Sequence, residues 1–184
     1  MSQTKEIELF YNWNFKDFPE FTTYNWMIND LYRGVQTDSN YLVTLGIIAY
    51  SEAIGWKIRG ENDDDKDNWA RFKAFTNQYM GYDFTSKASE KLYRNIRNEL
   101  AHHYFIKRGK ESIKKWLDKN NGPYSVISEV DGEITIFYNI FFNDFVNGVQ
   151  KYLSELMLKR SHGVRSHEFG HVDDSSGYNP NKNS

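Results

Sequence analysis

The chain has 184 residues, of which 39% are hydrophobic and 26% are charged, and its 23 basic and 25 acidic side chains give a formal net charge of -2. This length suits one domain with a sizeable core, and the near-neutral charge excludes bulk attraction to nucleic acid or to an anionic membrane. Because the chain has no cysteine, disulfides, thiol nucleophiles and Cys-ligated zinc are excluded. We therefore expect any contact with RNA to depend on a local group of basic side chains.

The beginning of the sequence has no basic segment followed by an apolar run, and no stretch approaches about 18 uninterrupted apolar residues. We therefore expect neither a secretion signal nor a membrane span. Together with the absence of cysteine, this pattern predicts a cytoplasmic protein without a membrane partner.

Helical periodicity and only three prolines predict a mainly α fold, a helical bundle. Pro19 is typical of a helix's first turn, and the polar residues 37–40 form a start signal for a helix that is apolar on nearly all sides. That helix, YLVTLGIIAYSEAIGW, is predicted to be the central and most buried one. The expected helices cover residues 19–36, 41–56, 69–80, 86–106 and 142–158.

A small β-hairpin is expected before the last helix, at about residues 124–138. Asp131 and Gly132 separate the strand-like runs YSVISEV and EITIFYN, and an Asp-Gly pair in this setting favours a two-residue hairpin turn. The preceding ESIKKWLDK is interpreted as a short amphipathic piece. We therefore expect one helical domain over residues 1–160 and a polar tail over residues 161–184 that is disordered or loosely packed.

The helix expected over residues 86–106 has two faces when its residues are placed about 100° apart. One face is apolar and predicted to join the core; it contains Leu92, Tyr93, Ile96 and Leu100. The opposite face is polar, and it is exposed or meets another surface; it contains Arg94, Asn95, Arg97, Asn98 and His102. His103 lies beside the apolar face, where a histidine is more often packed than reactive.

The types of side chain on the polar face suit a site that cleaves RNA. Asn98 lies four residues before His102, so its amide can hold the imidazole in one orientation. A guanidinium binds phosphate oxygens, and a neutral imidazole can remove a proton from the 2′-hydroxyl of RNA. Arg97 or Arg94 would then stabilise the charge that develops on phosphorus, without a metal ion. On spacing alone, such side chains are more often only solvated.

The segment RNELAHHY, from Arg97 to Tyr104, closely resembles the R-N-x-x-x-H signature of HEPN domains. Its longer form, R-x4-H-x-Y, resembles that of HEPN ribonuclease toxins that are paired with nucleotidyltransferase antitoxins. The resemblance implies that Arg97 and His102 are catalytic and that Asn98 is their polar companion. It also implies that Tyr104 is the tyrosine that such antitoxins modify. The alternative is that Tyr104, at the edge of the apolar face, only packs against the core.

The same resemblance implies a site shared by two copies of the chain. In HEPN nucleases the motifs face each other across a two-fold axis, so that each copy supplies one Arg and one His. The implied protein is a homodimeric ribonuclease of the toxin or phage-defence type, with RNA as substrate and an antitoxin as a second partner. Arg94 would add positive charge to the groove between the two copies. Because the net charge of the chain is near neutral, the positive field that attracts RNA has to be concentrated there. The alternative is a HEPN-like module that binds RNA or a protein without cutting.

Glu52 lies in the most apolar of the predicted helices. A buried carboxylate requires a cationic or hydrogen-bonding partner. Glu52 is therefore either an anchor for Arg94, Arg97 or His102, or a residue at the helix edge with its carboxylate in water.

The tail contains His167-Glu168-Phe169-Gly170-His171, which matches the H-E-x-x-H signature of zinc proteases. That chemistry requires a buried helix and a third metal ligand. Here the segment contains a glycine, is flanked by polar residues and precedes no further His or Glu. A zinc metalloprotease is therefore the remote alternative, and we expect neither a metal site nor a cofactor.

Overall fold

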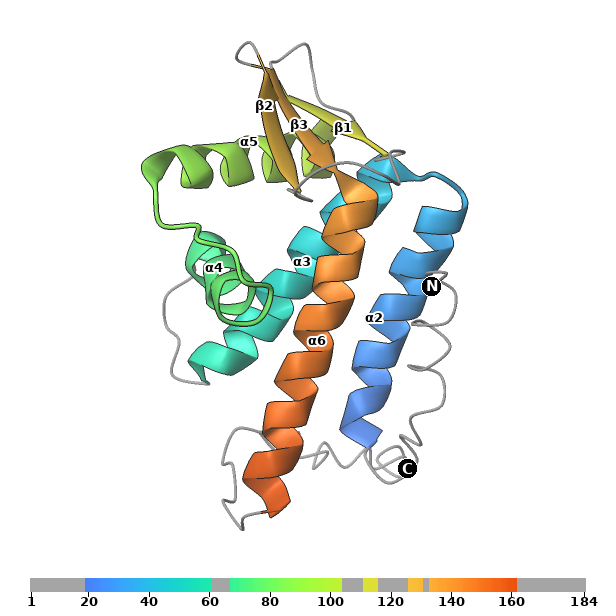
Figure 1. Ribbon diagram of the computed structural model, residues 1–184, viewed down its shortest axis with the longest axis vertical. Helices are drawn as coiled ribbons and strands as arrows, with labels where there is room; N and C mark the ends of the chain where they lie inside the picture. The colour runs from blue at the N-terminus through green and yellow to red at the C-terminus, as the bar shows by residue number, and fades with distance from the viewer. Residues whose placement is uncertain (1–18, 61–66, 104–110, 116–125, 131–132, 162–184) are drawn as a thin grey trace, which may run out of the picture.

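The structure is a computed structural model that describes residues 19–60, 67–103, 111–115, 126–130 and 133–161 (Figure 1). Over these residues the fold is mainly helical, with a small sheet before the last helix, as the sequence predicts. In chain order the elements are α2 (Pro19–Gln36), α3 (Asn40–Arg59), α4 (Asn68–Tyr79), α5 (Lys87–His103), β1 (Glu111–Lys114), β2 (Ile127–Val130), β3 (Glu133–Phe137) and α6 (Tyr138–Ser161).

The bounds of α2 and α4 and the start of α5 follow the prediction to within one residue, whereas α3 ends at Arg59, three residues after its predicted end. α2 has the expected bounds, and α4 begins after Asp67, whose side chain accepts a hydrogen bond from the Trp69 amide at 3.1 Å. α6 begins at Tyr138, earlier than the predicted residue 142, because β3 continues into the helix without a loop. The part of the α5 prediction beyond residue 103 and the predicted tail after residue 161 lie outside the described residues.

The sheet has three strands in the order β1-β3-β2. β2 and β3 are antiparallel, with Ile127 opposite Ile136, so the predicted hairpin is confirmed. β1 is not predicted by the sequence, because the pattern of its segment is that of a short amphipathic piece. It pairs in parallel with β3, with Ile113 also beside Ile136, and the side chain of Ile113 is buried.

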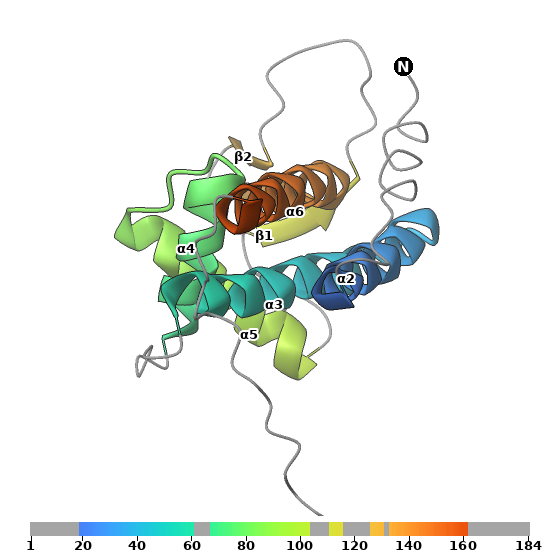
Figure 2. The ribbon, with the colours of Figure 1, turned by 90° about the horizontal axis from the view of Figure 1, so that it is seen from below.

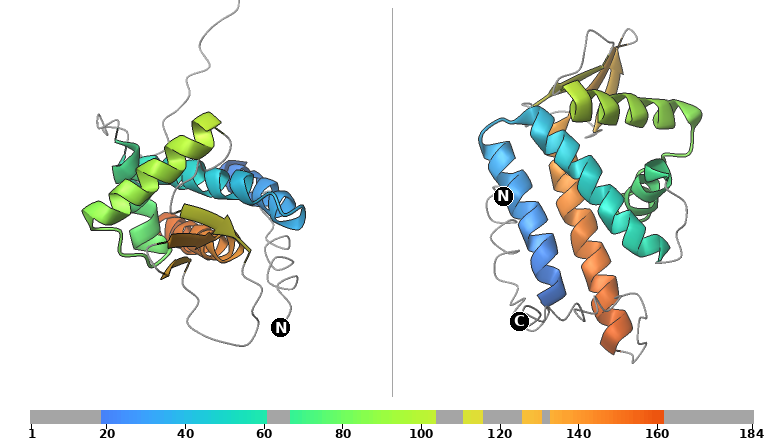
Figure 3. Two further views of the ribbon diagram at one scale, coloured as in Figure 1. Left: turned by 90° about the horizontal axis from the view of Figure 1, so that it is seen from above. Right: turned by 180° about the vertical axis from the view of Figure 1, so that it is seen from behind.

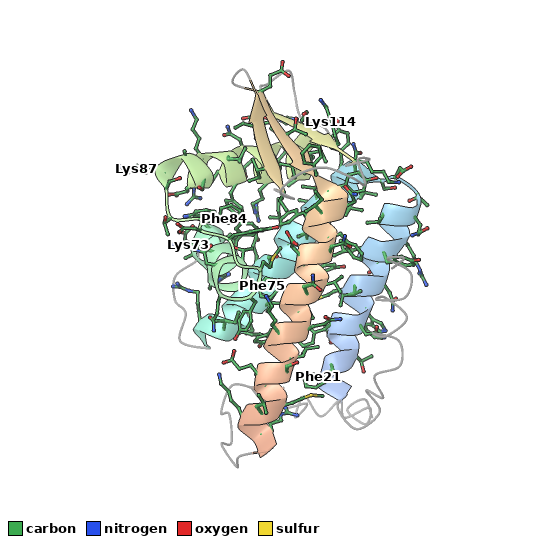
Figure 4. All side chains as sticks on the ribbon, viewed as in Figure 1. Phe21, Lys73, Phe75, Phe84, Lys87 and Lys114 are labelled. Carbon is green, nitrogen blue, oxygen red and sulfur yellow. The ribbon has the colours of Figure 1, made fainter. Side chains whose placement is uncertain are left out.

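Three long helices, α2, α3 and α6, run along the molecule, and α4 lies against α3 (Figure 1; Figure 3, right). α5 and the sheet occupy the same end of the molecule. The apolar face of α6 is buried; it contains Phe145, Val146, Val149, Tyr152, Leu153 and Leu156. In the stick view Phe75 of α4 lies at the middle of the helical layer, where its ring meets Phe145 edge-on at 5.8 Å (Figure 4).

α3 is the central helix, as predicted, because it contacts α2, α4, α5, α6 and β1. Its closest neighbour is α4. A methyl group added to Gly55 would lie 1.8 Å from the carbonyl oxygen of Arg71, so only glycine allows this approach. One face of α3 is nevertheless uncovered, with Leu42 49% exposed and Trp56 41% exposed.

Asp38, in the turn between α2 and α3, connects this turn to the sheet and to α6. Its backbone is left-handed, with φ of 51°. Its carboxylate accepts hydrogen bonds from Lys115, which follows β1, and from the Tyr138 hydroxyl at 2.8 Å. These bonds lower the pKa of Asp38.

No helix in the described part of the chain has the length and apolar character needed to cross a membrane.

Candidate functional site

The side chains of α5 separate into the two faces that its sequence predicts. Tyr93, Ile96 and Leu100 are buried and Leu92 is half-buried, so they form the expected core contact. The polar residues of the opposite face are exposed, namely Arg94, Asn95, Asn98 and His102. Arg97 is intermediate, with 31% of its side chain exposed, because it turns toward α3.

Arg97 forms an ion pair with Glu52 of α3. The Arg97 Nε donates to Glu52 Oε1 at 2.9 Å, and Nη2 lies 3.5 Å from Oε2. Only 13% of the Glu52 side chain is exposed, so this carboxylate is not the solvated helix-edge group of the alternative interpretation. Of the three predicted partners of Glu52, namely Arg94, Arg97 and His102, the structure places Arg97 against it.

Tyr93 completes this cluster from one turn earlier on α5. Its hydroxyl donates to Glu52 Oε1 at 2.6 Å, so a single carboxylate oxygen accepts from both Tyr93 and Arg97. Burial and the neighbouring Glu52 raise the pKa of Tyr93, so the phenol keeps its proton. The hydrogen bond with Glu52 raises the pKa of Arg97 and keeps the guanidinium charged. The sequence marks Tyr93 only as a core residue, and its hydroxyl contact was missed.

Arg94 has two carboxylate partners. Its Nη2 lies 3.0 Å from Asp67 Oδ1, and its Nε donates to Glu90 Oε1 at 2.9 Å. The Asp67 contact was not predicted, since Asp67 precedes α4 and is far from Arg94 in sequence. The two arginines on which a positive field was expected therefore face three carboxylates, those of Glu52, Asp67 and Glu90, and supply little net positive charge among the described residues.

His102 and Asn98 lie on the exposed face of the last two turns of α5. His103 is also exposed, contrary to the expectation that it packs beside the apolar face. It is the last residue of α5 in the described part of the chain. Tyr104 lies outside the described residues, as does the whole His167 to His171 motif. Within the described ranges, no group of three or more His, Asp or Glu side chains could hold a metal ion.

A small apolar pocket of about 40 Å³ lies beneath α5. Aromatic rings of α4, Trp69 and Phe72, line one side, and Leu92, Tyr93 and Ile96 of α5 line another. The ring of Tyr93 thus faces the core while its hydroxyl holds Glu52. The surface of the pocket is almost entirely apolar, so the pocket is not a candidate for chemistry.

Comparisons of the chain with protein-family models, with curated proteins and with solved structures give no match. The resemblance to HEPN domains is therefore carried by the motif residues themselves. The geometry adds a largely covered carboxylate, that of Glu52, which fixes Arg97 on the same helix as the exposed His102.

Proposed function

We propose that the protein is a metal-independent endoribonuclease of the HEPN toxin or defence type, active as a homodimer. The observation that carries the proposal is the fixed guanidinium of Arg97. Glu52 holds it through two nitrogens, and His102 lies on the next exposed turn of the same helix. A phosphate-binding cation and a proton acceptor on one short helical segment are the minimum requirement for cleavage through the 2′-hydroxyl of RNA.

In the proposed reaction the neutral imidazole of His102 takes the proton of the 2′-hydroxyl. The 2′-oxygen forms a bond to phosphorus while the bond from phosphorus to the 5′-oxygen breaks. The 5′-oxygen leaves with a proton from the imidazolium, either of the same His102 or of His102 in the second copy. The products are a 2′,3′-cyclic phosphate and a 5′-hydroxyl, so the proposed step uses no water molecule and needs no metal ion.

Arg97 is suited to the charge that develops on the phosphate. Its Nε and Nη2 are directed to Glu52, so its Nη1 side is directed away from that carboxylate. Glu52 and Tyr93 fix the plane of the guanidinium before substrate binds, which reduces the reorganisation needed in the transition state. Asn98 would orient the imidazole, and Arg94 would support binding of the RNA backbone.

The toxin interpretation adds a regulator. A nucleotidyltransferase-type antitoxin would modify Tyr104, two residues after His102, and add negative charge beside the phosphate site. This part of the proposal is supported by the R-x4-H-x-Y pattern of the sequence alone.

One observation favours a second candidate, a HEPN-like module that binds a partner without cutting RNA. Arg94 and Arg97 are both matched by carboxylates, as the side chains of a purely structural network would be. In that case the Glu52–Arg97 pair would serve only to fix α5 on α3.

Replacement of single histidines separates the two candidates. Purified wild type should cleave RNA in the presence of a metal chelator and leave cyclic phosphate ends. His102→Ala should lower the cleavage rate by at least about 100-fold, because it removes the proton acceptor. His103→Ala is the matched control, since it is the adjacent exposed histidine, and it should cleave like wild type. Unchanged cleavage by His102→Ala would exclude the site, and an inactive wild type would favour the binding module.

A further inference from the structure

One face of α3 is apolar and uncovered. Leu42 and Trp56 are 49% and 41% exposed, and Ala49 and Ala53 between them are exposed as well. Leu42, Ala49 and Trp56 recur every seven residues, so they lie in one line along the helix. We call these four residues the α3 strip. Such a line of apolar side chains is typical of a helix that packs against another helix.

We infer that the α3 strip pairs with the α3 strip of a second copy of this chain, antiparallel and with the two-fold axis at Ala49. A two-fold interface requires a self-complementary surface, in which residue i meets residue j and residue j meets residue i. Ala49 lies midway between Leu42 and Trp56. In this arrangement the large side chains at each end of the strip meet, Leu42 of one copy against Trp56 of the other. The small Ala49 side chains at the axis let the helices approach closely.

The charges on α3 favour a protein partner and this orientation. No Lys or Arg occurs between Leu42 and Trp56, so the strip lacks the cations that a nucleic acid would require. The basic residues of α3 are Lys57 and Arg59 in its last turn. A parallel pair would bring these basic ends together, whereas the antiparallel pair separates them and also opposes the helix dipoles.

The strip alone is too small for a stable dimer, so the end of α5 must take part. A standard interface buries about 800 Å² on each partner. A strip of about 15 residues is about 22 Å long and about 10 Å wide, or roughly 220 Å². The C-terminal end of α5 projects past α3 on the side opposite α6 (Figure 2; Figure 3, left). Ala101 and His102 are exposed on this projecting end.

The inferred interface therefore contains the α3 strip and the last turns of α5 from both copies. Each copy contributes its Arg97 and His102 to the border of the shared surface. The pairing itself stands on the geometry of α3 and of the end of α5, and only its use as a shared active site rests on the proposed function.

A charge placed at the inferred axis tests the pairing. Wild type should show a concentration-dependent dimer in sedimentation equilibrium, without RNA. Ala49→Glu would bury two like charges at the axis, and it should raise the dimer Kd by at least about 100-fold. Ala88→Glu is the matched control, an exposed alanine near the other end of α5, and it should dimerise like wild type. A monomeric wild type, or a dimeric Ala49→Glu protein, would overturn the inference.

Because the chain has no cysteine, disulfides between engineered cysteines can show which residues of the two α3 strips face each other, without interference from native thiols. The double variant Leu42→Cys, Trp56→Cys should form disulfide-linked dimers under mild oxidation, and neither single variant should. Cross-linking by Leu42→Cys alone would indicate a parallel pair and overturn the antiparallel arrangement. This readout remains informative if Ala49→Glu impairs folding.

RNA cleavage by the monomeric variant separates this inference from the proposed function. If Ala49→Glu is monomeric and still cleaves RNA, the interface stands and the shared active site is wrong. If wild type is monomeric but loses cleavage in His102→Ala, the role of His102 in RNA cleavage stands, whereas the interface and the proposed homodimer are wrong.

Discussion

Tyr93 has two functions at once. Its ring packs in the core against Trp69 and Phe72, with ring centroids 5.1 and 4.8 Å away. Its hydroxyl reaches out of the same cluster to Glu52, which in turn holds Arg97. The orientation of an arginine on the polar face of α5 is therefore set by a residue on the apolar face.

Replacement of Tyr93 by Phe should remove this link while keeping the ring. Glu52 would keep only its Arg97 partner, and a lost hydrogen bond to a charged group predicts a decrease of about 1–2 kcal/mol in the free energy of unfolding. Urea denaturation measures this change. Tyr50→Phe is the control, because the Tyr50 hydroxyl is 3.4 Å from the exposed Asp30, and it should cost less than about 0.5 kcal/mol. Equal losses in the two variants would mean that the Tyr93 hydroxyl has no special role.

With the exception of His103, the sequence predicts which α5 side chains are exposed and which are packed, because the spacing of residues along a helix determines the face on which each one lies. It also limits Glu52 to a few cationic partners. It does not predict the Tyr93 hydroxyl contact or Asp67 as a partner of Arg94, since both depend on how α5 crosses α3 and α4. The pattern of residues within one helix gives no information about the angle at which that helix crosses its neighbours.

At the scale of whole elements, α3 and α4 are joined by an unusually close approach at Gly55. A Cβ atom there would lie 1.8 Å from the Arg71 carbonyl oxygen and 2.5 Å from its carbonyl carbon, both of which belong to the α4 backbone. Backbone atoms cannot rotate out of the way as a side chain can. The separation of these two helices therefore depends on one missing methyl group.

Gly55→Ala should force the two helices apart. We expect a loss of at least about 3 kcal/mol in the free energy of unfolding, because the displacement disrupts the packing on both sides. Gly46→Ala is the matched control in the same helix, since its added methyl group meets only the end of the Leu31 side chain. It should be far less destabilising, as Leu31 can change rotamer and alanine favours the helix. Thermal melts of the two variants compare them directly, and similar midpoints would contradict the expectation.

The elements that the sequence predicts least well are β1 and the start of α6. β1 is a strand of only four residues, and its side chains become partly buried only when it pairs with β3. Residues 138–141 follow a strand and include Tyr138, Ile140 and Phe141, a composition that suits a strand as well as a helix. Short apolar runs of this kind are decided by tertiary contacts rather than by local preference.

Across the whole molecule, tyrosine hydroxyls connect elements that are distant in sequence. Four of them in the described part of the chain donate to carboxylates at 2.6 to 2.8 Å. The pairs are Tyr79–Glu155, Tyr82–Asp144, Tyr93–Glu52 and Tyr138–Asp38. The high aromatic content of this chain thus serves packing through the rings and cross-linking through the hydroxyls.

One of these carboxylates should make the stability of the protein depend on pH. Partial burial raises the pKa of Asp144 above 3.8, although the Tyr82 hydroxyl and Lys151 act in the opposite direction. The folded state then binds the proton more tightly than the unfolded chain, so this contribution is present below about pH 3.8 and is lost as the pH rises through the folded pKa.

Asp144→Asn isolates this contribution, because its amide does not titrate but still accepts from Tyr82. The free energy of unfolding of wild type, minus that of Asp144→Asn, should fall as the pH is raised from about 3.5 to 7. Urea titrations at several pH values measure the difference. A difference that grows with pH would show that the hydrogen bond, rather than burial, dominates the pKa of Asp144.

The central strand of the sheet is the last of its three strands along the chain, and this order has a consequence for synthesis. α5 and β1 leave the ribosome before β3 exists, so β1 has no strand to pair with until the hairpin is complete. β3 continues directly into α6, so the same segment closes the sheet and starts the last long helix. A nascent chain that stops before residue 133 contains the entire Arg97–His102 motif but lacks the strand on which the sheet beside α5 is assembled.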